Sequence, residues 1–136
     1  VSEITRLRTV SSLQINAELQ PMRVRGDERR LLQVFRNVLD NAARYAKSAI
    51  IVGMERRPGE VVVSVDNDGE IISSQDRDRV FERFARLDAS RSSDGGGSGL
   101  GLAISREIML AHGGTVLASE WNGWCRFEVI LPVDAR

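Results

Sequence analysis

A glycine-rich stretch that runs directly into a helical pattern occupies residues 95–104, with the sequence GGGSGLGLAI. From its end onward, the apolar residues Leu100, Ile104 and Ile108 recur at helical spacing. Backbone N–H groups at such a helix start carry a partial positive charge, which suits a phosphate group. Glycine allows the backbone to approach a ligand closely because it has no Cβ. A flexible linker before an ordinary core helix would give the same pattern, so this stretch alone leaves phosphate binding open.

A second candidate site lies on a long helix that we predict from Glu28 to about Ala46. Its apolar stripe consists of Leu31, Phe35, Val38, Leu39, Ala42 and Ala46. At 3.6 residues per turn, Asn37, Asn41 and Arg44 fall within an arc of about 60° on the opposite side. Asparagine is a poor helix former. Two asparagines one turn apart on one face therefore indicate either a ligand site or a merely solvated face.

A third candidate is the polar loop Asp66-Asn67-Asp68-Gly69, which follows a predicted strand at Val61 to Val65. That strand and an earlier one from Ala49 to Glu55 form a predicted antiparallel hairpin. Polar loops at strand ends often carry function. A simple Asx turn would explain the same residues.

Length and composition exclude several classes of function. The 136 residues fit a single domain, and 19 basic residues balance 19 acidic ones, so nucleic acid is not an expected partner. Lys47 is the only lysine, which excludes a P-loop. Cys125 is the only cysteine, which excludes a disulfide framework or a CxxC metal site. No apolar run reaches the length of a membrane span, so we expect no direct membrane contact by this domain.

The remaining pattern predicts a two-layer α/β sandwich, with helices on one face of a mixed, mainly antiparallel sheet. We expect residues 1–12 to be a linker or the end of a preceding segment, and residues 89–98 to be a long mobile loop. His112 is expected to cap the second main helix, before the glycines that follow it. The other predicted elements are strands at Leu13–Leu19, Met22–Val24, Thr115–Ser119 and Arg126–Leu131, a short helix or turn from Ser73 to Arg79, and the helix Leu100–Ala111.

Four motifs in fixed order resemble those of the GHKL ATPase superfamily, and in particular its sensor histidine kinase branch. Asn37–Tyr45 resembles the N box, Val65–Ile71 the first glycine box, Val80–Phe84 the F box, and residues 95–104 the second glycine box. The resemblance covers about Val24 to Leu131. It implies the Bergerat fold, with ATP and Mg²⁺ held between the N-box helix and a lid at residues 89–98.

The resemblance also implies roles for single residues. Asn41 would coordinate Mg²⁺, and Asn37 would support phosphate or metal binding. Arg44 takes the place of a basic residue near the phosphates, Tyr45 that of an aromatic residue beside adenine, and Arg86 that of an arginine that reaches the γ-phosphate. Asn37, Arg44 and Arg86 would be the catalytic residues. The further nucleotide contacts would come from Asn67, Asp68, Gly69, Phe84, Gly97, Gly99, Leu100, Gly101 and Leu102.

The first glycine box departs from the family pattern. Where the family usually has an Asp that accepts a hydrogen bond from the adenine amino group, this chain has Asn67, and Ile71 stands at the second glycine position. An Asn carbonyl can accept the same bond, without the charge-assisted strength of a carboxylate. Asp66 or Asp68 could instead be the adenine contact.

The resemblance implies a histidine kinase catalytic domain that donates the γ-phosphate to a histidine on a separate dimerisation and phosphoacceptor domain, for relay to a response regulator. It would be a cytoplasmic domain of a membrane-anchored sensor kinase. One alternative is an ATPase of the gyrase type, but such relatives carry a Glu as base four residues before the metal Asn, where this chain has Asn37. The other is a degenerate nucleotide-sensing or protein-binding module, which the departures at Asn67 and Ile71 keep open.

Overall fold

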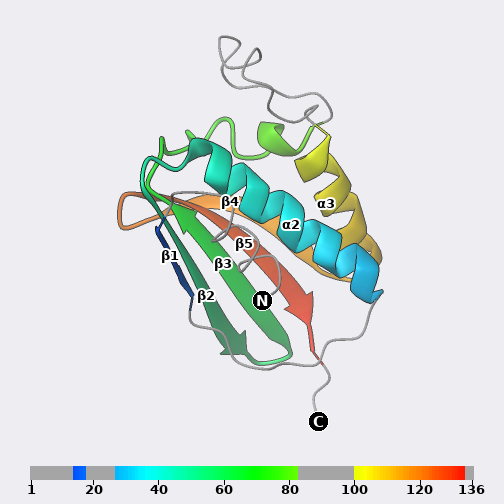
Figure 1. Cartoon of the computed structure of the whole chain (residues 1–136). Helices are drawn as coiled ribbons and strands as arrows, with labels where there is room; N and C mark the ends of the chain where they lie inside the picture. The colour runs from blue at the N-terminus through cyan, green and yellow to red at the C-terminus, as the bar shows by residue number, and fades with distance from the viewer. Residues whose placement is uncertain (1–13, 18–26, 83–99, 134–136) are drawn as a thin grey trace.

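The computed structural model describes residues 14–17, 27–82 and 100–133. In this part of the chain, two helices cover one face of a five-stranded sheet (Figure 1). The elements are β1 (Gln14–Ala17), α2 (Glu28–Tyr45), β2 (Ala49–Arg57), β3 (Glu60–Asn67), the 3₁₀ turn η1 (Arg79–Phe81), α3 (Gly101–Ala111), β4 (Thr115–Trp121) and β5 (Trp124–Pro132). The predicted two-layer α/β sandwich is confirmed.

The strand order is β1-β2-β3-β5-β4, and only the β1–β2 pair is parallel. A tight turn joins the two strands of each antiparallel hairpin, β2–β3 and β4–β5. Between β2 and β3, Gly59 adopts a φ of 77° directly after Pro58, which suits a proline–glycine turn. Between β4 and β5, Asn122 and Gly123 have φ values of 50° and 81°, as a two-residue hairpin turn with the twist of the strands requires. The sheet is therefore mixed and mainly antiparallel, as predicted.

Helix α2 begins directly after Asp27, whose side chain caps its first turn. The Asp27 carboxylate accepts hydrogen bonds from the backbone N–H groups of Arg29 and Arg30, at 3.0 and 3.3 Å. These bonds satisfy donors that have no partner inside the helix. The buried face of α2 consists of Leu31, Val34, Val38, Leu39 and Ala42. The helix ends within one residue of its predicted limit.

The core lies between the helices and the sheet. Alternate residues of β3 and β5 point into it, because side chains in a strand alternate between faces. Phe127 of β5 meets Phe81 edge to face, with ring centroids 6.1 Å apart and an interplanar angle of 80°. Phe81 is buried, and Arg106 of α3 lies over its ring at 5.0 Å. Phe81 of the F-box motif is thus a core residue that ties η1 to α3 and the sheet.

Some predicted segments lie outside the described residues. They are the strand at Met22–Val24, the linker at residues 1–12 and the loop at residues 89–98. The turn expected after Ser73 is present, and it leads into η1. No helix in residues 27–82 or 100–133 has the length and apolarity needed to cross a bilayer.

Candidate nucleotide-binding site

Helices α2 and α3 lie side by side on the sheet (Figure 1). The contact between them joins two of the predicted site regions directly. The Nδ2 atom of Asn37 in α2 donates hydrogen bonds to the carbonyl oxygen of Gly101, at 3.0 Å, and to the hydroxyl of Ser105, at 3.1 Å. The N-box helix and the start of the glycine-fed helix are therefore neighbours on one side of the molecule.

Asn41 and Arg44 follow Asn37 along α2. Asn41 lies one turn further on and is half-buried, and Arg44 is exposed in the last turn. Neither side chain makes a hydrogen bond or ion pair with another described residue. A half-buried amide without a partner is unusual, because polar groups removed from water normally find one. Both side chains are therefore available to a ligand.

The start of α3 differs from that of α2. Its N-cap position is Leu100, which makes no side-chain capping bond, and its first turn holds no acidic residue. A Cβ on Gly101 would make only ordinary contacts with Asn37, 3.6 Å or more away, and the φ of Gly101 is not positive. The fold itself thus does not demand glycine at this position. An uncapped helix start without a Cβ at its first residue is suited to the close approach of an anion.

Asn67 ends β3 and is almost fully buried, with 1% of its surface exposed. Its Oδ1 atom accepts a hydrogen bond from the Gly69 N–H at 2.9 Å, which identifies the other side-chain atom as the amide nitrogen. That Nδ2 atom has no hydrogen-bond partner among the described residues. Cys125 lies directly opposite on β5, and burial raises the pKa of its thiol, so the sulfur stays neutral and is a weak acceptor.

Gly69 packs against the end of α2. A Cβ at this position would collide with the backbone carbonyl oxygen of Tyr45. The fold therefore requires glycine here, in contrast to Gly101. This close contact sets the Asn67–Gly69 loop beside Tyr45, so the residues predicted for the adenine side are also brought together.

Asp68 anchors the chain that follows α2. Its carboxylate accepts hydrogen bonds from the N–H groups of Lys47 at 2.7 Å, Ser48 at 3.0 Å and Ala49 at 3.2 Å, and from the Ser48 hydroxyl at 2.6 Å. Burial by itself would raise the pKa of Asp68, but these bonds outweigh it and hold the pKa well below its usual range. The carboxylate is thus used to join the α2–β2 connection to the end of β3.

Asp66 faces the other side of the sheet. It forms a two-bond ion pair with Arg126 of β5, at 2.7 and 2.9 Å, and the guanidinium lies 4.6 Å from the ring centre of Trp121. The hydrogen bonds that Arg126 donates to the Asp66 carboxylate raise the pKa of Arg126 above its ordinary value. Of the two polar residues at the end of β3, Asp66 and Asn67, only Asn67 is on the sheet face that the helices cover.

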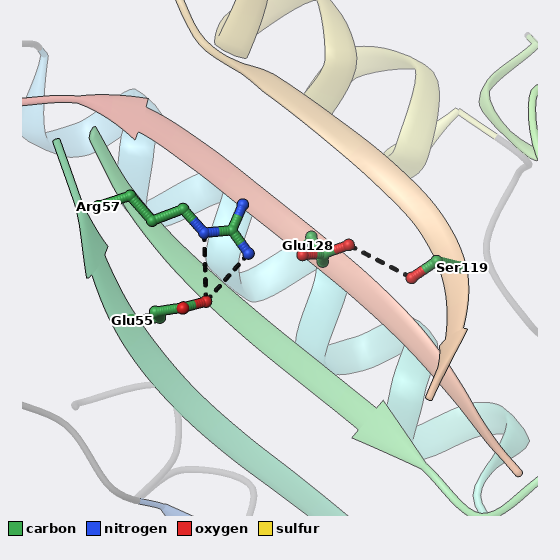
Figure 2. A network of polar contacts seen from close by, with 4 residues as sticks. All are labelled: Glu55, Arg57, Ser119 and Glu128. Atoms are coloured by element: carbon green, nitrogen blue, oxygen red, sulfur yellow. Dashed lines mark hydrogen bonds and ion pairs between the residues drawn. The ribbon is translucent and has the colours of Figure 1, made fainter. Parts of the chain in front are cut away.

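The sheet face without helices carries further polar pairs. Arg57 donates to Glu55 within β2, and Ser119 of β4 donates to Glu128 of β5 (Figure 2). Glu55, Arg57, Ser119 and Glu128 alternate along their strands with core residues, so they share the face of Asp66. This face is separate from the candidate site.

Four predicted site residues lie outside the described residues: Phe84, Arg86, Gly97 and Gly99. Leu102 is half-buried and packs at the edge of the core. The structure adds Ser105, which the sequence reasoning did not single out. Its one signal in the sequence is a small polar residue one turn after Gly101 within an apolar helix.

The His112 ring makes one hydrogen bond within α3 and one to the start of α2. Its Nε2 atom accepts from the backbone N–H of Asp27 at 3.0 Å, so the proton of the neutral ring is on Nδ1, which lies 2.8 Å from the carbonyl oxygen of Ile108. The predicted capping role is confirmed. The ring acts as a neutral bridge from the end of α3 to the start of α2.

Comparison with known proteins places this geometry in a family. Residues 26–135 match the family described as histidine kinase-, DNA gyrase B-, and HSP90-like ATPase. The chain is 41% identical over 115 residues to the sensor protein VanS of Enterococcus faecium, covering 83% of this chain and 30% of that protein. It is 41% identical over 117 residues to the probable sensor histidine kinase TcrY of Mycobacterium tuberculosis, covering 85% of this chain and 25% of that protein. The chain thus spans less than a third of the length of these curated relatives.

Solved structures show the same fold. The mycobacterial sensor histidine kinase MprB superposes with a TM-score of 0.83 at 30% identity, covering 96% of this chain and 89% of that one. The ATP-binding domain of PrrB from Mycobacterium tuberculosis superposes with a TM-score of 0.76 over 98% of this chain and 89% of that one, but its 20% identity shows the fold alone. The predicted Bergerat fold is confirmed by these likenesses. The chain belongs to the histidine kinase-, DNA gyrase B- and HSP90-like ATPase family, and it is homologous to sensor histidine kinases.

Proposed function

We propose that this domain binds Mg-ATP between α2 and the start of α3 and donates the γ-phosphate to a histidine on a separate dimerisation and phosphoacceptor domain. The observation that supports this best is the Asn37–Gly101 hydrogen bond, because it sets the amide face of α2 beside the uncapped start of α3. Full-length ShkA, which was solved in complex with AMPPNP, superposes with a TM-score of 0.78; at 23% identity this likeness supports the fold of this chain alone.

The residues present fit the nucleotide. The first N–H groups of α3, together with the absence of a Cβ at Gly101, suit the phosphate chain. Asn41 offers an amide oxygen to Mg²⁺, which prefers oxygen ligands and shares them with phosphates. Arg44 balances phosphate charge. Tyr45 and Asn67 lie on the adenine side, and Arg86, Gly97 and Gly99 stay predicted phosphate contacts.

Bound Mg-ATP would supply the phosphoryl group and the charge neutralisation that its transfer requires. The acceptor imidazole nitrogen would form the new bond to the γ-phosphorus, the bond from that phosphorus to the β,γ-bridging oxygen would break so that ADP leaves, and the imidazole would release its proton to solvent. The phosphohistidine would then pass the group to a response regulator. His112 does not fit the acceptor role, because both of its ring nitrogens are engaged with the backbone.

Hydrolysis of ATP by this domain alone is the less suitable function. The position four residues before Asn41 would have to hold a base for water. Asn37 stands there, and its amide nitrogen donates to α3. An amide takes no proton at neutral pH, so water lacks an activating group at this position.

The first experiment is a titration of the domain with a non-hydrolysable ATP analogue, with Mg²⁺ and with EDTA, followed by calorimetry. We expect binding that Mg²⁺ strengthens, and we expect Asn41→Ala to remove the Mg²⁺-dependent gain without lowering the melting temperature. Gln33→Ala is the matched control, because Gln33 is exposed on the same helix. Absence of binding at millimolar analogue would favour the degenerate module instead.

The second experiment tests transfer. The phosphoacceptor domain of the intact protein is supplied in trans with ATP, and acid-labile, base-stable phosphate on that domain is measured. We expect phosphohistidine with the unaltered domain and none with Asn41→Ala. If the domain binds the analogue but transfers no phosphoryl group to the supplied domain, the proposal of ATP binding is kept and the kinase role is rejected.

A further inference from the structure

Ser105 is a fully buried hydroxyl in the middle of α3, with none of its surface exposed to solvent. It donates a hydrogen bond to the carbonyl oxygen of Gly101 at 2.9 Å and accepts one from Asn37 Nδ2 at 3.1 Å. Asn37 Nδ2 also donates to the Gly101 carbonyl at 3.0 Å. Asn37, Gly101 and Ser105 thus form a closed triangle of hydrogen bonds, hereafter the Asn37 lock.

The Asn37 lock determines which way the amide is turned. A side-chain amide has two N–H donors, and here each has its own acceptor on α3. The reversed amide would set its oxygen against the carbonyl oxygen of Gly101, where two acceptors repel each other. The network therefore assigns the nitrogen to α3 and leaves the oxygen on the other side.

The Asn37 oxygen is left available beside the candidate site. It accepts no hydrogen bond from any described residue, and an ideal Cβ on Gly101 would lie 3.7 Å from it, which places it next to the start of α3. Asn41 lies one helical turn away on the same helix, and its amide makes no hydrogen bond with a described residue. A lone acceptor oxygen repels phosphate oxygens and suits either a cation or the water that a cation carries.

We propose that Ser105 is a positioning residue that holds the Asn37 amide so that only its carbonyl oxygen faces the ligand. Asn37 then contacts the Mg²⁺ side of the site and makes no direct contact with phosphate. This inference rests on the proposed Mg-ATP site. According to this inference, Asn37 and Asn41 both serve to bind the cation. Without the Ser105 hydroxyl, one N–H of Asn37 loses its acceptor on α3, and only the Gly101 carbonyl still holds the amide.

The test compares Ser105→Ala with the unaltered domain by titration of the ATP analogue in Mg²⁺ and in EDTA. One hydrogen bond of this kind is worth about 1 kcal/mol, so we expect the Mg²⁺-dependent gain in affinity to fall about fivefold. Affinity in EDTA should be unchanged or slightly higher. Ser105→Thr, which keeps the hydroxyl, should restore the gain. Ser119→Ala is the matched control, since it removes a serine hydroxyl bond on the opposite sheet face.

A second readout needs no ligand. In an amide nitrogen–proton NMR spectrum, the Asn37 side-chain N–H pair, assigned by its loss in Asn37→Asp, should exchange slowly with water. Ser105→Ala should shift this pair and speed its exchange, and Ser105→Thr should reverse the change.

The outcomes separate the inference from its premise. If Ser105→Ala weakens analogue binding equally with and without Mg²⁺, the role of Ser105 is only structural and the inference is overturned. The inference is also overturned if Ser105→Ala leaves the NMR signals of the Asn37 side-chain N–H pair unchanged. Failure of the unaltered domain to bind the analogue would reject the proposed function, and with it the cation role of Asn37. The amide exchange would then still decide whether the Asn37 lock exists.

Discussion

Asn37 and Gly101, which are 64 positions apart in the sequence, are joined by a hydrogen bond of 3.0 Å between a side-chain amide and a backbone carbonyl. The bond runs from the middle of α2 to the first residue of α3. It fixes the helix that carries Asn41 and Arg44 relative to the helix start that is suited to phosphate. The site thus depends on the packing of two helices and not on either motif alone.

Two glycines of the predicted site differ in what the fold asks of them. Gly69→Ala should lower the free energy of unfolding by about 1–3 kcal/mol, because its Cβ would collide with the Tyr45 carbonyl. Gly101→Ala should leave stability unchanged or slightly raised, because its Cβ meets only ordinary contacts and alanine favours a helix. Gly101→Ala should instead lower the affinity for the ATP analogue at least about tenfold, which corresponds to about 1.4 kcal/mol of binding free energy. Denaturant melts and analogue titrations check both, and full affinity in Gly101→Ala would argue against phosphate approach at this residue.

Asp68 should make stability depend on pH in the acid range. Its folded-state pKa is depressed by the donated hydrogen bonds, so its contribution is complete above the unfolded pKa of about 3.9 and is lost as the pH falls further toward the folded pKa. The melting temperature of Asp68→Asn should therefore be lower than that of the unaltered domain at pH 7, and this difference in melting temperature should become smaller below about pH 4. Thermal melts from pH 7 to pH 3 measure it. A gap of constant size across this range would contradict the assignment.

His112 should couple the end of α3 to the start of α2. His112→Ala removes an acceptor for the Asp27 N–H and a donor to the Ile108 carbonyl, so we expect a loss of about 1–2 kcal/mol in unfolding free energy. Leu110→Ala is a suitable control, because Leu110 is 62% exposed near the same helix end. Hydrogen exchange of the Asp27 amide should quicken in the histidine variant alone. If His112→Ala and Leu110→Ala change the unfolding free energy and the Asp27 amide exchange equally, His112 has no bridging role.

Asp66 should matter for stability and not for nucleotide. Asp66→Ala leaves Arg126 largely buried without its carboxylate, at 20% side-chain exposure, and should cost about 3–5 kcal/mol. Glu55→Ala breaks the exposed pair with Arg57 on the same sheet face (Figure 2) and should cost about 1 kcal/mol at most. Analogue affinity of the folded protein should be unchanged in both. A large loss of affinity in Asp66→Ala with intact folding would restore Asp66 as an adenine contact.

Much of the fold could be predicted because its signals are local. The apolar stripe of α2, the Asp27 cap and the turn residues Pro58-Gly59 and Asn122-Gly123 each act within a few positions. The alternation along β3 carries a further signal, because neighbouring strand residues face opposite sides, so Asp66 and Asn67 cannot both face the helices. Strand alternation in the sequence could therefore narrow the choice of adenine contact among Asp66, Asn67 and Asp68.

The amino-acid sequence by itself determined the family motifs, the helix and strand periods and the two amides on one helix, because these follow from residue types at short spacing. Only the tertiary structure decided how they are used. The partner of Asn37 is 68 positions away at Ser105, and the donors that engage Asp68 lie 19–21 positions earlier. Whether a polar side chain is left for a ligand depends on which distant donors and acceptors packing brings to it, and local sequence carries no record of those distances.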